Sequence, residues 1–173
     1  MCWSQTRCPG SVRKVNQVGK IVYVPACGDR FYEQRIVFGS RMVDVKVSTL
    51  DTNGGFCIFE ITDALKGGPA RHFHHEQEEW FYVIESEYII EIGDERCKLG
   101  PGDSVLAPRK VPHVWAHVGE GMGRLIITLQ PAGKMEAFFG ELAKVEGPPS
   151  REELHGMFRS HGMELTGPPL SIE

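Results

Sequence analysis

The segment 71–83 carries the side chains most able to do chemistry, and it reads Arg-His-Phe-His-His-Glu-Gln-Glu-Glu-Trp-Phe-Tyr-Val. Successive side chains of a β-strand point to opposite faces, so His72 and His74 would direct their rings to one side and His75 to the other. Cα atoms two positions apart on a strand lie roughly 7 Å from each other, a separation that two imidazoles can close around one ion. The spacing therefore indicates a pair of metal ligands.

A carboxylate and a third histidine complete the candidate site. Glu79 lies an odd number of residues after His74, so the polar segment 75–78 must bend before the glutamate can turn to the same side. His113 follows a proline at the start of another candidate strand. Any one of these histidines alone would be better explained as a surface or core residue. Together with Glu79 they predict one divalent metal ion.

The elements that must position these side chains are mostly short strands. Aromatic and β-branched runs alternate with turn formers such as Gly93-Asp94 and Gly100-Pro101-Gly102. This pattern is typical of an antiparallel sandwich or barrel of the all-β class. The expected strands span residues 21–24, 35–38, 42–47, 56–61, 79–84, 87–92, 96–99, 104–107, 113–118 and 124–129.

Only the part of the chain after Pro131 has a helical period. Apolar side chains between residues 135 and 145 recur every three or four residues, which predicts an amphipathic helix. Ser150 and Glu153 form a capping box that would start a second helix. The predicted organisation is a flexible tail or strap at 1–19, a β-barrel at 20–131 and a C-terminal helical extension at 132–173.

The two histidine segments resemble the paired motifs of the cupin family. The matching residues are Gly67 or Gly68, His72, His74, Glu79, Gly102, Pro108 and His113. Ser86 and Lys110 stand where the family pattern has glycine, and His117 stands where it has asparagine. Both replaced glycines fall in turns, where a residue can need a backbone angle that glycine adopts most easily.

This resemblance implies a double-stranded β-helix, a jelly-roll barrel, with one divalent metal ion inside one end. The implied ligands are His72, His74, Glu79 and His113. Three imidazoles and one carboxylate leave two positions of an octahedron free for water, dioxygen or substrate, which is a catalytic arrangement, whereas purely structural zinc is usually closed by four protein ligands. The donor set does not choose among Fe, Mn, Ni, Cu and Zn.

Within the family, the chain looks like small single-domain cupins that have been likened to quercetin dioxygenases. This similarity implies a metal-dependent dioxygenase in which Glu79 could also act as the catalytic base. Two other classes stay open, since one fold hosts many chemistries. One is a non-oxidative isomerase or decarboxylase of a small acid or sugar, and the other is a small-molecule-binding or sensor protein without catalysis.

Strand parity suggests which side chains would face a substrate. Phe81 shares the side of Glu79, and Trp115 shares that of His113, so both would line an aromatic pocket for a planar ligand or simply fill the core. Trp80 and Tyr82 would face outward.

Three polar residues beside the motifs have open roles. Arg71 and Arg109 could meet an acidic substrate, although such arginines are more often solvated loop residues. His117 could support a ligand, contact substrate or be structural, and we favour the structural role.

Composition sets wider limits. A chain of 173 residues suits one domain, and its net charge of −4, without a run of Lys and Arg, argues against a nucleic-acid partner. The apolar runs are too short to span a membrane, and the N-terminus lacks the apolar stretch of a secretory signal. Five scattered cysteines indicate reduced thiols in a cytosol-like compartment. We expect a cytoplasmic homodimer that binds a small molecule, with neither nucleic acid nor membrane as partner.

Overall fold

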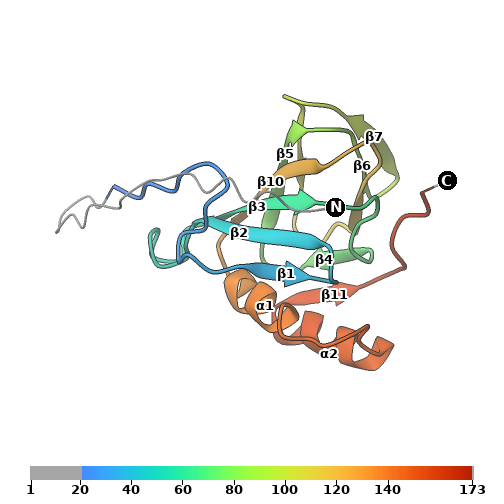
Figure 1. Ribbon diagram of the computed structural model, residues 1–173. Coiled ribbons are helices and arrows are strands. Elements are labelled where there is room, and N and C mark those ends of the chain that lie inside the picture. The colour runs from blue at the N-terminus through green and yellow to red at the C-terminus, as the bar shows by residue number, and fades with distance from the viewer. Residues whose placement is uncertain (1–20, 173) are drawn as a thin grey trace.

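The computed structural model describes residues 21–172, which consist mostly of short strands with two helices near the C-terminus (Figure 1). The strands are β1 Arg35–Val37, β2 Arg41–Val47, β3 Cys57–Asp63, β4 His72–His74, β5 Glu78–Glu85, β6 Tyr88–Ile92, β7 Glu95–Leu99, β8 Ser104–Ala107, β9 His113–His117, β10 Gly123–Gln130 and β11 Met163–Leu165. The helices are α1 Met135–Leu142 and α2 Arg151–Ser160.

Two antiparallel sheets build the barrel. The first has six strands in the order β1-β2-β3-β10-β5-β8, and the second has five in the order β11-β4-β9-β6-β7. Sequence neighbours often lie in different sheets, as in a jelly roll, where the chain crosses repeatedly between two layers. The predicted all-β jelly roll with two C-terminal helices is confirmed.

Alternating side chains place the core between the two sheets. In β5, Phe81 and Val83 are fully buried, whereas Trp80 and Tyr82 are 36% and 37% exposed. This matches the predicted parity of the strand. Burial of each large apolar side chain contributes about 1.5–3 kcal/mol, so the alternation fixes the register of β5 and with it the direction of Glu79.

Two short segments differ from the predicted elements. Residues 21–24 form no strand, and Ile21 and Tyr23 are 84% and 74% exposed, because the segment has no partner strand within residues 21–172. Strand β11 was not predicted, since three residues are too few to show a period. It pairs with β4, with Met163 opposite His74 and Leu165 opposite His72.

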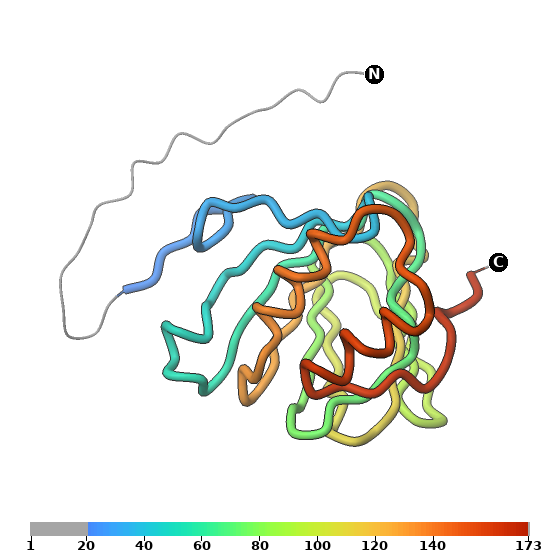
Figure 2. Tube along the Cα trace, turned by 90° about the horizontal axis from the view of Figure 1, so that it is seen from below, coloured from blue at the N-terminus to red at the C-terminus, as the bar shows by residue number. Residues whose placement is uncertain are grey.

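The two helices lie against one side of the barrel, as the view from below shows (Figure 2). Helix α1 buries Met135, Phe138 and Leu142, and it ends earlier than residue 145. The predicted capping box of α2 is confirmed, because Ser150 Oγ accepts from the amide of Glu153 and the Glu153 carboxylate accepts from the amide of Ser150. The predicted tail at 1–19 lies outside the described residues, and the division of the chain at 131/132 stays a prediction.

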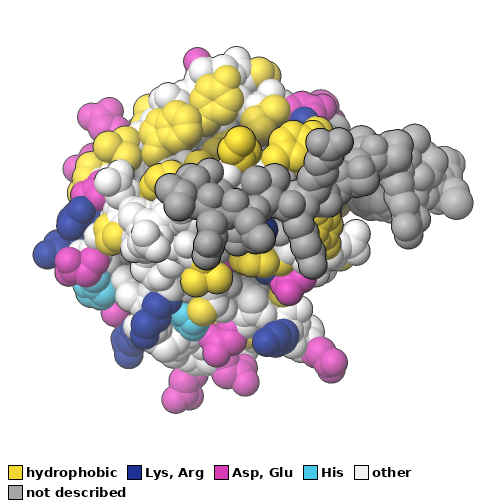
Figure 3. Space-filling view, turned by 90° about the vertical axis from the view of Figure 1, so that its left-hand side faces the viewer, with side chains coloured by type: hydrophobic (Ala, Val, Ile, Leu, Met, Phe, Trp, Pro, Cys, Tyr) yellow, Lys and Arg dark blue, Asp and Glu magenta, His cyan; other side chains and the backbone are white. Residues whose placement is uncertain are grey.

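Charged side chains of both signs cover much of the surface. On the face seen in Figure 3, Lys and Arg lie among Asp and Glu, and hydrophobic side chains gather towards the top. Within residues 21–172 no helix has the length and apolar character needed to cross a membrane. The described cysteines Cys27, Cys57 and Cys97 are free thiols. The homodimer expected from the sequence stays a prediction.

A buried ion network ties the six-stranded sheet together at Glu60. This β3 side chain is 5% exposed and contacts Lys46 Nζ at 2.9 Å and Arg124 Nε at 2.9 Å, from the strands on either side. Burial alone would raise the pKa of Glu60, but the hydrogen bonds and charges of Lys46 and Arg124 outweigh it and hold the pKa below its ordinary value of 4.5. In the folded protein, the Glu60 carboxylate therefore links β3 to its two neighbours, β2 and β10.

The variant Glu60→Gln should lower the free energy of unfolding at pH 7 by roughly 1–3 kcal/mol, because the buried contacts with Lys46 and Arg124 lose their negative charge. A carboxyl whose folded pKa lies below its unfolded pKa stabilises the fold above the unfolded value, and this stability is lost as pH falls through the folded value. The difference between wild type and variant should thus shrink below about pH 4.5. Urea unfolding of both proteins at several pH values from 7 to 3 measures this difference in the free energy of unfolding. Glu120→Gln, which removes an exposed ion pair with Lys66, is the control and should change stability by less than about 0.5 kcal/mol. A difference that stays constant over this pH range would contradict the prediction.

Candidate metal centre

Four buried side chains from three strands meet inside the barrel. His72 and His74 come from β4, Glu79 from β5 and His113 from β9, and each is at most 5% exposed. One ligand atom of each lies within 4.8 Å of the other three. The sequence-predicted cluster is therefore brought together, although its occupation by a metal stays a prediction.

The local structure of each strand explains this convergence. In β4 only Phe73 between the two histidines is partly exposed, so both rings enter the barrel as the i, i+2 spacing predicts. His72 lies opposite His113 in the pairing of β4 with β9. Bends at His75 and Glu76 reverse the parity, as expected, and bring Glu79 in from the other sheet.

Backbone carbonyls fix the tautomers of two rings. His72 Nδ1 lies 2.8 Å from Ala70 O, and His113 Nδ1 lies 3.1 Å from Val111 O. A carbonyl oxygen can only accept, so each Nδ1 carries the hydrogen. In the neutral ring, Nε2 then holds a lone pair that is free to bind a metal.

Gln77 fixes the third ring. Its Nε2 donates to Pro131 O and Ala132 O, both at 2.9 Å, so the other amide atom must be the oxygen. That Oε1 lies 3.0 Å from His74 Nδ1 and accepts its hydrogen. His74 Nε2 consequently presents a lone pair to the cluster, as the other two rings do.

The resulting site fits a cation. His74 Nε2 is buried and has no hydrogen bond within residues 21–172, although it lies 3.0 Å from Glu79 Oε2. His113 Nε2 lies 2.8 Å from the same oxygen. Lone pairs that face a carboxylate at these distances repel unless a positive charge lies among them. Metal–ligand bonds of about 2.1 Å place neighbouring ligand atoms roughly 3 to 4 Å apart, so a divalent ion fits after a small inward movement.

The protonation states of the cluster favour a metal over a proton. Burial, reinforced by the charges of His113 and His74, lowers the pKa of His72 to about 3. Burial would raise the pKa of Glu79, but positive charge and hydrogen-bond donation from the rings of His113 and His74 outweigh it and lower the pKa below its usual range; a bound cation would supply the same positive charge when those rings are neutral. At neutral pH His72 is therefore neutral and Glu79 is ionised, which are the forms that bind metals.

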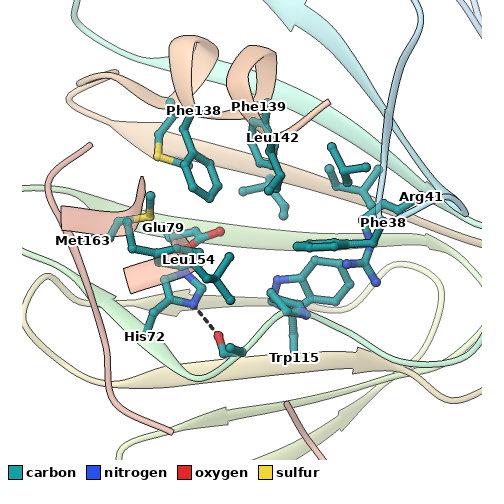
Figure 4. Close-up of a pocket in the computed structure, with 17 residues that line it drawn as sticks. Phe38, Arg41, His72, Glu79, Trp115, Phe138, Phe139, Leu142, Leu154 and Met163 are labelled. Carbon is teal, nitrogen blue, oxygen red and sulfur yellow. Dashed lines mark hydrogen bonds between the residues drawn. The ribbon is translucent and has the colours of Figure 1, made fainter. Parts of the chain in front are cut away.

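A small apolar cavity adjoins the cluster (Figure 4). Its volume is about 60 Å³, and His72 and Glu79 form part of its wall. Trp115 also lines it, whereas Phe81 does not and instead packs edge-on against His113, with ring centres 6.1 Å apart. The substrate contacts predicted for Trp115 and Phe81 stay predictions, and only Trp115 has a position that permits direct contact. The apolar lining residues include Phe38, Ile61, Phe138, Phe139, Leu142, Leu154 and Met163.

The other polar residues of the motifs lie outside the cavity wall. Arg71 pairs with Glu91, and Arg109 pairs with Glu78. His117 is fully buried, with Nε2 2.9 Å from Ser86 Oγ and Nδ1 3.3 Å from Leu65 O. Both ring nitrogens of His117 thus have protein partners, in agreement with the structural role that we favour.

Backbone angles explain the glycines of the family pattern. Ser86 and Lys110, which replace two of them, have φ values of 69° and 65°. These are left-handed conformations that glycine adopts at lower cost. At Gly68 a Cβ would lie 1.6 Å from the carbonyl oxygen of Trp115, so the close approach of these two segments requires glycine.

Sequence reasoning missed two residues of this site, Gln77 and Arg41. Gln77 lies in a segment that was expected only to bend, and its contact with residues 131 and 132 spans more than fifty positions. Arg41 begins β2 and lines the cavity at a distance from the motifs. No local pattern marks either residue.

Comparisons with known proteins agree with the fold. Residues 61–129 match the family model described as Cupin domain. Among solved structures, KdgF from Halomonas sp. is 18% identical, with a TM-score of 0.54 over 61% of this chain and 92% of that chain. An RmlC-like cupin from Shewanella frigidimarina is 24% identical, with a TM-score of 0.48 over 58% and 84% of the two chains. The polyketide cyclase RemF from Streptomyces resistomycificus is 23% identical, with a TM-score of 0.48 over 57% and 72%. A search of curated proteins finds no match. The quercetin-dioxygenase subgroup stays a prediction.

The ligand set can be tested with two adjacent histidines. His74→Ala removes one of the four donors, so bound metal should fall from about one ion per chain to below about a tenth of that. His75→Ala removes an exposed histidine one position away and should leave the metal content unchanged. Elemental analysis of protein loaded with Mn²⁺ or Zn²⁺ and then desalted measures both. Full occupancy in His74→Ala would show that the ligand set is wrong.

The support given by Gln77 can be measured separately. In Gln77→Ala, His74 Nδ1 loses its acceptor and two carbonyl groups lose their donor, so metal affinity should fall about 10- to 100-fold while the four ligands remain. Glu76→Ala, at an exposed position in the same bend, is the matched control and should bind like wild type. Competition with a chelator gives the affinities. Equal affinities in the two variants would refute the role of Gln77.

Proposed function

Because the chain contains a cupin domain at residues 61–129, we propose that it is a metal-dependent cupin enzyme, a dioxygenase that acts on a small apolar or aromatic molecule. The observation that carries this proposal is the position of the buried donor cluster in the wall of an apolar cavity. A substrate in that cavity would lie directly beside the donor atoms.

The donor set supports catalysis rather than a closed structural site. His72, His74, Glu79 and His113 would hold one divalent ion and leave coordination positions for a substrate and dioxygen. When bound, a redox-active ion such as Fe, Mn, Ni or Cu supplies Lewis acidity and the means to reduce dioxygen.

The side chains around the ion would exclude water, orient the substrate and accept a proton from it. The apolar wall excludes water, and Trp115 offers a flat surface for a planar molecule. Glu79 uses Oε2 towards two rings, while Oε1 has no hydrogen bond in the described part of the chain and can accept a proton from a substrate hydroxyl. Because the pKa of Glu79 is lowered, it accepts that proton only from an acidic donor.

The apolar cavity wall favours a small apolar or aromatic substrate over the sugar or polyol substrate of an isomerase. Its charged or polar side chains are His72, Glu79 and Arg41, and all its other lining side chains are apolar. A sugar carries a hydroxyl on nearly every carbon, and burying those groups without partners costs several kcal/mol. A small apolar or aromatic compound has few or no hydroxyl groups and therefore does not pay this desolvation cost.

Cavity size limits the substrate further. The volume of about 60 Å³ is less than half of the roughly 150 Å³ that holds benzene in an engineered protein cavity. A molecule with one ring can enter only if side chains from α1 and α2 move aside. A flavonol, with three rings, does not fit this cavity, so we propose a smaller substrate than quercetin.

Dioxygen consumption tests the proposal. Protein loaded in turn with Fe²⁺, Mn²⁺, Ni²⁺, Cu²⁺ or Zn²⁺ is mixed with small phenols, catechols and β-diketones, with quercetin as the oversized compound. At least one redox-active form should consume dioxygen with a one-ring or smaller compound, and His74→Ala treated identically should not. Dioxygen left untouched by every metal form across the panel would end the dioxygenase proposal, and conversion of a compound under argon would favour a non-oxidative enzyme.

A further inference from the structure

The cavity has a charged group that the metal chemistry does not use. Arg41, the first residue of β2, lines it together with Trp115 and Phe38. Figure 4 shows these three side chains on one side of the cavity and His72 with Glu79 on the other. The cavity is thus apolar in the middle and polar at two ends.

Arg41 is held rigidly in this position. Its Nε donates to Asp63 Oδ1 at 2.5 Å, and the other oxygen of Asp63 accepts from Tyr88 at 3.0 Å. Its Nη2 donates to Gly67 O at 3.3 Å, and its guanidinium carbon lies 4.6 Å from the centre of the Trp115 ring. A donor with so many fixed contacts is already oriented before a ligand arrives, which lowers the entropy cost of binding.

One end of the guanidinium has no partner. Arg41 Nη1 has no hydrogen bond within residues 21–172, although the side chain is only 11% exposed. The planar guanidinium group binds carboxylates strongly because its N–H groups match two oxygens at once. Because Arg41 lines the cavity, this nitrogen, which has no protein partner among the described residues, is suited to an anionic acceptor on a ligand.

Several arginines in the described part of the chain bind one acidic partner through two nitrogens, whereas Arg71 and Arg96 each give Glu91 one nitrogen. Arg124 gives both Nε and Nη2 to Glu60, and Arg30 gives both to Asp51. Arg41 gives Asp63 its Nε alone. An arginine that only balanced a buried aspartate could make the same two-point contact, but here Nη2 donates to Gly67 O and Nη1 has no protein partner in the described residues.

We propose that Arg41 is a specificity-determining residue that binds a carboxylate at the end of the substrate far from the metal-binding residues. The preferred ligand is then a small apolar or aromatic acid, with its other end at His72 and Glu79. The orientation of the acid rests on the proposed function, whereas the preference for a carboxylate rests on Arg41 alone.

Two ligands of nearly equal shape test this preference. 4-Hydroxybenzoate carries a carboxylate where 4-hydroxybenzamide carries a neutral amide, and calorimetry gives the dissociation constant of each for metal-free and Mn²⁺-loaded protein. Wild type should bind the acid at least about tenfold more tightly than the amide in both forms. Arg41→Gln should reduce this ratio to near one, and Arg96→Gln, which removes an exposed arginine outside the cavity, should leave it unchanged.

A second variant guards against misfolding. Arg41→Gln leaves Asp63 buried without its cation, so the double variant Arg41→Gln/Asp63→Asn removes both charges and keeps an acceptor for Tyr88. A ratio near one in the double variant supports the proposal. An unchanged ratio there, or equal binding of acid and amide by wild type, overturns it. Failure of Mn²⁺ to tighten binding of either ligand would instead count against the proposed function, because the acid-to-amide ratio is measured in the metal-free protein as well.

Discussion

The convergence of three imidazole lone pairs and a carboxylate in a dry interior is the constraint on which the other features of the site depend. Burial of these groups is costly unless a positive charge lies among them. The chain meets this cost by giving each Nδ1 a fixed acceptor: Ala70 O, Val111 O and Gln77 Oε1. Because those acceptors hold the hydrogens on the outer side of each ring, the inner sides have no hydrogen with which to satisfy one another. The arrangement is therefore compatible with a cation bound among the four side chains.

Much of this site follows from the sequence because strand parity is a strict rule. Side chains two apart face the same way, which places His72 with His74, and the odd spacing to Glu79 requires the bend that is found at residues 75 and 76. Positive φ angles at Ser86 and Lys110 follow from the family pattern for a similar reason, since the pattern has glycine where the backbone is left-handed. Local rules thus predict the ligand cluster and most strands.

What the sequence does not predict depends on contacts between distant segments. The run at residues 21–24 has strand-forming residues but no partner, whereas β11 has little local signal and forms because β4 offers it a free edge. Gln77 is recognisable only once residues 131 and 132 are known to lie beside it, and Arg41 only once β2 is known to border the cavity. Propensity and parity contain no information about such pairings.

The metal-binding candidates and much of the cavity wall come from different parts of the chain. All four metal-binding candidates lie inside the matched domain at residues 61–129, together with the carbonyls and the amide that orient them. Much of the cavity wall lies outside it, on β1, β2, α1 and α2 and on β11, and Arg41 is among these residues. The part that matches the Cupin domain model holds the donors, and the flanking segments supply much of the cavity wall beside them. A likeness confined to the matched part therefore predicts the donor set far better than the shape of the cavity, since much of the cavity wall lies outside that part.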